Sequence, residues 1–205
     1  NPWAQAHKLA DGFCFLYSGT LGMKHNPDLL LKLALHFRDD PTVRVVVISE
    51  GLGAEWLTAQ QAALGVMNLV LLPYQPFDAL ANVLATADVL IAILEPDAGV
   101  FSVPSKVLSY LCMERPLLLA IPPENLAAKI VTESEAGVVV PPEEPAAFIQ
   151  QANQLRQNKT LRERLGRNGR VYAETHFNIE KITDQFETII HQMNHTTDPY
   201  QERKK

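Results

Sequence analysis

A hydroxyl and an ammonium group are adjacent at Ser105 and Lys106, directly after Pro104 and before a segment with helical periodicity. Proline suits the first turn of a helix, where its missing N–H costs no hydrogen bond. The N–H groups of Ser105 and Lys106 then have no acceptor within the helix, and the positive end of the helix dipole lies beside them. Such a helix start can bind phosphate, so the segment predicts an anion site, with a solvated lysine at an ordinary helix start as the alternative.

A glycine-containing loop follows the first apolar run, in the stretch YSGTLGMKH at 17–25. Gly19 and Gly22 allow a tight turn or a close approach of the backbone to a ligand, and Lys24 and His25 add positive charge. The spacing matches neither G-x-G-x-x-G nor a Walker loop. The loop therefore predicts either a phosphate contact or an ordinary turn.

Two further loops carry weaker signals. Pro73 and Pro76 stiffen the chain around Tyr74 and Gln75, whose backbone could read the edge of a nucleobase or simply form a rigid loop. A carboxylate pair at Glu95 and Asp97 could act as acid and base, although acids in such a position more often cap a turn. The six histidines show no metal-ligand spacing, so no metal site is predicted.

Composition narrows the class of protein. The chain has 205 residues, 47% of them hydrophobic and 20% charged, as in a compact globular protein. A net charge of −5 argues against a nucleic-acid partner. The two cysteines, Cys14 and Cys112, exclude a disulfide scaffold and favour a reducing, cytoplasmic location. The chain starts without methionine or leader, which predicts a piece of a longer protein, with a domain at 1–195 and a polar tail at 196–205.

Hydrophobic periodicity predicts the elements that must position these residues. Apolar runs predict six strands, at 13–18, 43–49, 69–73, 88–94, 116–121 and 136–141. Helical segments separate them at 26–40, 54–64, 76–87, 104–113 and 124–135, and only helices follow, at 145–157, 159–176 and 178–193. Because the strands are apolar throughout, both faces of the sheet should be covered. The pattern predicts an α/β fold, a Rossmann-like doubly wound parallel sheet of about six strands with C-terminal helices. Ligands bind such sheets at the carboxyl ends of the strands, where these polar segments lie.

The order of these motifs resembles the C-terminal, donor-binding half of family 4 (group 1) glycosyltransferases of the two-domain GT-B type, in the bacterial surface-polysaccharide branch. The similarity covers almost the whole chain. The matching stretches are NPW at 1–3, YSGTLGMKH at 17–25, PYQP at 73–76, TADVLIAIL at 86–94, VPSKVLSYL at 103–111 and AGVVVPPEE at 136–144.

The resemblance implies transfer of a sugar, with retention, from a nucleotide-diphosphate sugar, with UDP favoured, to a glycan or lipid-linked acceptor. It implies no metal or other cofactor, an acceptor domain outside this chain, and a full-length enzyme in the cytoplasm or on the inner face of the membrane. Donor-binding roles are expected for Gly19, Thr20, Lys24, His25, Tyr74, Gln75, Ser105, Lys106 and Ser109.

The sequence departs from the family pattern where its two glutamates are expected. Phe101 and Ser109 stand in their places, Thr20 replaces an arginine, and Glu114 replaces a glycine before the next strand. Ser109 could form one hydrogen bond with the ribose, but no catalytic residue is assigned. Two alternatives stay open: a nucleotide-sugar epimerase using Glu95 and Asp97, and a non-catalytic, degenerate transferase subunit. A nicotinamide dehydrogenase is disfavoured because no dinucleotide fingerprint follows any strand.

Overall fold

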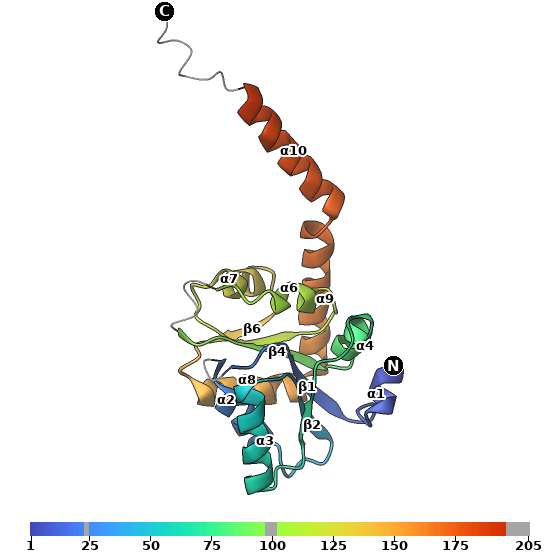
Figure 1. Cartoon of the computed structure of the whole chain (residues 1–205), viewed down its shortest axis with the longest axis vertical. Helices are drawn as coiled ribbons and strands as arrows, with labels where there is room; N and C mark the ends of the chain where they lie inside the picture. Colours follow the sequence, from blue (N-terminus) through green and yellow to red (C-terminus); the bar gives the residue numbers. More distant parts are fainter. Residues whose placement is uncertain (23–24, 97–101, 196–205) are drawn as a thin grey trace, which may run out of the picture.

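A six-stranded parallel sheet forms the centre of the protein in the computed structural model, which describes residues 1–22, 25–96 and 102–195 (Figure 1). The strand order is β3-β2-β1-β4-β5-β6, and every neighbouring pair is parallel. The strands are β1 Phe13–Ser18, β2 Val43–Ile48, β3 Leu69–Leu72, β4 Val89–Ile93, β5 Leu117–Ala120 and β6 Gly137–Val140. This order is that of a doubly wound Rossmann sheet.

Helices cover both faces of the sheet (Figure 1). They are α1 Pro2–Ala6, α2 Pro27–His36, α3 Leu52–Leu64, the 3₁₀ turn η2 Phe77–Ala79, α4 Leu80–Ala85, α6 Lys106–Leu111, α7 Leu126–Glu133, α8 Pro145–Gln157, α9 Lys159–His176 and α10 Ile179–His195. The side chains of β1 alternate between two apolar cores. Phe15 and Tyr17 pack on the side of α2 and α8, whereas Cys14 and Leu16 pack on the side of α6 and α7.

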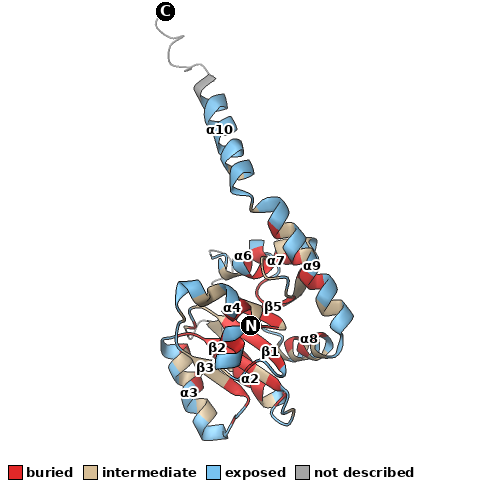
Figure 2. Ribbon diagram, turned by 90° about the vertical axis from the view of Figure 1, so that its right-hand side faces the viewer, coloured by how far each residue is buried: buried red, intermediate tan, exposed pale blue. Residues whose placement is uncertain are grey.

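The last helix leaves the body of the molecule. Figure 2 shows the coloured part of α10 as almost entirely exposed, while the strands and the inner faces of the other helices are buried. It carries exposed apolar side chains, Ile179, Phe186, Ile189, Ile190 and Met193. Within the described ranges, no helix is both long and apolar enough to cross a membrane.

The α/β fold and the six strands predicted from the sequence are confirmed, with strand ends within one residue of the apolar runs. Three local details differ. The segment 76–87 divides into η2 and α4, the helix expected from Pro104 begins at Lys106, and α1 had no predicted counterpart. The tail at 196–205 lies outside the described residues, so the predicted division into a domain and a tail stays a prediction.

Candidate functional site

The crevice of the sheet opens between β1 and β4. Chain connections run in opposite directions from these two strands, because β2 and β3 lie to one side and β5 and β6 to the other. Pairing of β1 with β4 covers only Phe15 and Leu16, although β1 stays paired with β2 as far as Ser18. The carboxyl ends of β1 and β4 therefore separate, and ligands bind open α/β sheets at this kind of position.

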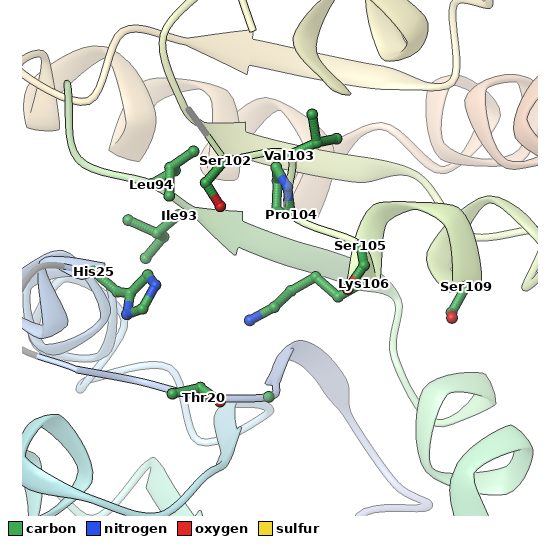
Figure 3. A pocket seen from close by; sticks show the side chains of 11 residues that line it. Thr20, His25, Ile93, Leu94, Ser102, Val103, Pro104, Ser105, Lys106 and Ser109 are labelled. Carbon is green, nitrogen blue, oxygen red and sulfur yellow. The ribbon is translucent and has the colours of Figure 1, made fainter. Parts of the chain in front are cut away.

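A cavity of about 460 Å³ occupies this crevice (Figure 3). Its walls come from the loop after β1, the end of β4 and the segment that leads into α6. The lining residues are Gly19, Thr20, His25, Ile93, Leu94, Ser102, Val103, Pro104, Ser105, Lys106 and Ser109. Six of the nine residues predicted to bind a donor thus lie around one cavity.

The wall before α6 presents backbone donors. In this turn the Val107 N–H donates to the Pro104 C=O at 3.0 Å, and it is the first N–H that bonds the backbone carbonyl of a described residue. The amides of Ser105 and Lys106 precede that bond, and no side chain caps the helix. The buried Asn125 holds the same segment from outside, because its amide donates to the Ser102 C=O at 2.8 Å.

Lys106 extends from α6 across the end of the sheet. Its Nζ lies 3.7 Å from the centroid of the Tyr17 ring, and Figure 3 shows the side chain pointing into the cavity between Thr20 and the α6 wall. Burial lowers the pKa of Lys106 to about 7. None of the ion pairs between described residues includes this lysine. An anion in the cavity would therefore supply an opposite charge that the described residues do not provide.

Gly19 makes room for that lysine. A Cβ on Gly19 would lie 3.0 Å from both Cε and Nζ of Lys106, and the φ of +125° is one that other residues rarely adopt. The glycine predicted from the sequence to approach a ligand thus also allows Lys106 to cross the end of β1.

The opposite wall is a short hydrogen-bonded turn. The Gly22 N–H donates to Nδ1 of His25 at 3.0 Å, and the His25 N–H donates to the Gly22 C=O at 2.9 Å. Thr20 is held from two sides, because Tyr17 donates to its carbonyl at 2.6 Å and the Tyr74 hydroxyl donates to its Oγ1 at 3.3 Å. Both His25 and Thr20 face the cavity in Figure 3.

The remaining predicted residues are placed differently. Tyr74 contacts the cavity only through Thr20, and its N–H donates to the Glu50 carboxylate at 3.2 Å. The side chain of Gln75 accepts from the Trp3 indole at 3.1 Å and donates to the Pro73 carbonyl at 2.9 Å. Gln75 is not among the lining residues, and Lys24 lies outside the described residues. The prediction that the backbone at 74–75 reads a base stays untested.

Carboxylates are absent from the described lining of the cavity. Ser109 lines it, whereas Glu95 does not, and Asp97 and Phe101 lie outside the described residues. No cluster of three His, Cys, Asp or Glu able to hold a metal occurs within the ranges that the structure describes. The arrangement offers one half-buried lysine, backbone amides and hydroxyls, a set of donors suited to a phosphate or diphosphate.

Sequence reasoning missed three residues that shape the site. Tyr17 supports Lys106 and Thr20, Tyr110 joins α6 to β1, and Asn125 fixes the segment before α6. Tyr17 and Tyr110 lie within the motif stretches 17–25 and 103–111, but their apolar surroundings mark them only as core. The asparagine at the predicted start of the helix at 124–135 was the available signal for a cap.

Comparison with known proteins identifies a family over most of the chain. The family model described as glycosyl transferases group 1 matches residues 3–172. WcaI of Escherichia coli (strain K12), assigned as a colanic acid biosynthesis glycosyl transferase, is 27% identical over 175 residues, which cover 83% of this chain. The match spans 41% of the length of that relative.

Solved structures share the fold. HepE of Anabaena, determined in complex with UDP and glucose, has a TM-score of 0.79 at 16% identity, covering 93% of this chain and 51% of its own. The C-terminal domain of LpcC, a glycosyl transferase group 1 family protein from Francisella tularensis, has a TM-score of 0.71 at 13% identity and covers 85% of this chain and 91% of its own.

Proposed function

The chain belongs to the glycosyl transferases group 1 family, and on that premise we propose that it is the donor-binding half of an enzyme that takes its sugar from a nucleotide-diphosphate sugar. A UDP-sugar is the favoured donor, because HepE is described in complexes with UDP and with UDP-glucose. The proposed transfer proceeds with retention to a glycan or lipid-linked acceptor.

One observation carries the proposal: Lys106, which forms no ion pair with a described residue, points into the cavity at the switch point of the sheet, beside backbone amides at the start of α6. A departing nucleotide diphosphate gains negative charge as its bond to the sugar breaks. Fixed amides and an ammonium group beside the leaving group stabilise that charge without reorganising. A metal is therefore not required by the proposed mechanism.

The residues receive the following roles in this proposal. Ser105, Lys106 and the backbone at Gly19 hold the diphosphate. Thr20 and His25 line the opposite wall, with Lys24 as a further positive charge. Ser109 donates to or accepts from a ribose hydroxyl, and the backbone at Tyr74 and Gln75 contacts the base.

The acceptor, the linkage and the catalytic group belong to the complete enzyme. We propose an acceptor domain outside this chain, a cytoplasmic location and peripheral contact with the inner face of the membrane. The 205-residue chain should then bind nucleotide weakly and transfer no sugar.

Calorimetry of the chain with UDP, GDP and UDP-glucose tests the proposal. We expect weak binding of UDP and UDP-glucose, and a loss of about tenfold or more in affinity for Lys106→Ala. Lys32→Ala is a matched control, because Lys32 lies on α2 in an exposed ion pair with Asp28 and does not line the cavity. Absence of binding by the wild-type chain, or equal affinity in Lys106→Ala, would contradict the proposal.

A degenerate, non-catalytic subunit remains the second candidate, because Ser109 occupies a position where the family pattern has a glutamate and no carboxylate is found in the described lining. Both candidates bind the donor, so binding does not separate them. Activity of the full-length protein with a lipid-linked acceptor does, since only the first candidate turns over a UDP-sugar. Nothing in the described cavity favours an epimerase, for which Glu95 would have to line it.

A further inference from the structure

Tyr17 contacts both walls of the cavity while remaining outside it. The side chain is completely buried, and its ring lies on the core side of the sheet that faces α2 and α8. Lys106 comes from α6, which packs on the other side. The lysine therefore crosses the carboxyl end of β1 to place its ammonium 3.7 Å from the centroid of the tyrosine ring.

The ring supplies the negative surface that the ammonium needs. The face of an aromatic ring attracts a cation, and the attraction is stronger where water is excluded. Within the described residues Lys106 has no carboxylate partner, so the ring is its main electrostatic support. Without such a contact, the four-carbon side chain of a lysine loses its conformational freedom only when the ligand binds, which weakens binding.

The hydroxyl of the same tyrosine supports the opposite wall. It donates to the Thr20 carbonyl at 2.6 Å and so closes the turn that begins at Gly19. Burial raises the pKa of Tyr17, which keeps the hydroxyl protonated and able to donate at neutral pH.

We propose that Tyr17 is a positioning residue for the donor: its ring holds the Lys106 ammonium over Gly19, and its hydroxyl fixes the carbonyl of Thr20. One buried side chain thereby sets the distance between the cation and the facing loop before any ligand enters. This inference rests on the proposed function, because it assigns to Lys106 the binding of a diphosphate. Such preorganisation reduces the conformational entropy that is lost when the donor binds.

Isosteric changes to the ring test the first part. Phenylalanine and pentafluorophenylalanine at position 17 have similar shapes, but fluorination reverses the ring quadrupole, so the ring face no longer attracts a cation. We expect UDP to bind the fluorinated chain about three- to tenfold more weakly than Tyr17→Phe. Phe15, two residues earlier on the same face of β1, is the matched site: pentafluorophenylalanine there should leave UDP affinity unchanged. Equal affinity of the two position-17 proteins, or equal losses at positions 15 and 17, would overturn the proposal.

The titration of Lys106 gives a readout that needs no nucleotide. The lysines are reductively methylated with ¹³C-formaldehyde and a borane reductant, and the Lys106 resonance is identified by its loss in Lys106→Arg. In Tyr17→Phe we expect Lys106 to titrate with the same midpoint pH as in the wild-type protein. With pentafluorophenylalanine at position 17 we expect a lower midpoint pH, because the ring face no longer attracts the ammonium. Other titratable groups around Lys106 and Tyr17 that can contribute to the titration are His25 on the facing loop, Tyr110 on α6 and Tyr74 after β3.

The outcomes separate this inference from the proposed function. If Lys106→Ala still binds UDP, the proposed role of the lysine is wrong, whatever its titration shows. If Lys106→Ala loses binding but fluorination at 17 changes neither the titration nor the affinity, the proposed function stands and the role of Tyr17 is wrong. The hydroxyl is tested by Tyr17→Phe alone, for which we expect about threefold weaker UDP binding through a loosened Thr20; unchanged affinity would refute that part.

Discussion

The hydroxyl of Tyr110 takes the place of a β-strand beside Ser18. It accepts a hydrogen bond from the Ser18 N–H at 3.0 Å and donates one to the Ser18 C=O at 3.1 Å. These groups face the side on which β4 would pair if its pairing with β1 continued beyond Leu16. The strands can therefore separate and open the crevice without leaving the part-buried backbone groups of Ser18 unpaired.

Tyr110→Phe should destabilise the chain by about 1–2 kcal/mol, because both part-buried backbone groups of Ser18 lose their partner. Urea denaturation followed by circular dichroism measures the change. Tyr172→Phe is the control, since the described residues show no hydrogen bond of that hydroxyl, and it should change the free energy of unfolding by less than about 0.5 kcal/mol. Equal stabilities of Tyr110→Phe and the wild type would contradict the structural role of the two bonds.

The sequence predicts the sheet well, because strands that are buried on both faces appear as continuous apolar runs in the sequence. The runs at 13–18 and 43–49 are apolar at nearly every position, and no knowledge of their neighbours is needed to recognise them. The lining of the cavity is partly predictable for a similar reason: proline, hydroxyl and lysine at 104–106 identify a helix start, and Gly19 identifies a special backbone position.

Contacts between residues far apart in the sequence produce no such local pattern. Tyr110 and Ser18 are 92 positions apart, and periodicity shows that the tyrosine is buried but not which groups its hydroxyl bonds. Gln75 lies in a loop suited to face a ligand, yet the Trp3 indole from 72 positions away engages its side chain. These partners depend on how the layers pack, and only the three-dimensional structure supplies that information.

Gly19→Ala should impair both stability and donor binding. The new Cβ would press against Cε and Nζ of Lys106, and alanine disfavours the φ of +125°. We expect a loss of about 1–2 kcal/mol in stability and about tenfold in UDP affinity. Gly51→Ala isolates the backbone effect, because Gly51 has a φ of +99° but its Cβ would meet nothing within 4 Å. If the two variants bind UDP equally well, Gly19 has no special relation to the lysine.

Glu114→Gly should stabilise the chain by about 0.5–1 kcal/mol. Glu114 has a φ of +55°, a left-handed conformation that costs a side chain with a Cβ more than it costs glycine. The glycine that the resemblance leads one to expect at this position would adopt the same conformation at lower cost. Glu135 also has a positive φ, of +48°, but its carboxylate lies 3.4 Å from Arg164, so Glu135→Gly should stabilise less. Thermal unfolding of both variants measures the difference, and a lower midpoint for Glu114→Gly than for the wild type would contradict the explanation.

The affinity for UDP-glucose should fall as the pH rises above neutrality. Desolvation lowers the pKa of Lys106 to about 7 in the free chain, and a bound diphosphate would raise it by adding an opposite charge. Binding then takes up a proton, so affinity is highest where the free lysine is already protonated. Between about pH 7 and about pH 8.5 we expect a decrease of roughly tenfold, since about one proton is linked to binding.

UDP-glucose is preferred to UDP for this measurement, because its diphosphate has no terminal group that titrates near neutral pH. Lys106→Arg keeps a positive charge at every pH used and should remove the dependence. A His25→Gln background removes the other titratable side chain that lines the described cavity, and the decrease should persist there. A wild-type affinity that is constant across this range would mean that Lys106 is not the group that meets the diphosphate, because a lysine in that role cannot bind the anion without first gaining its proton.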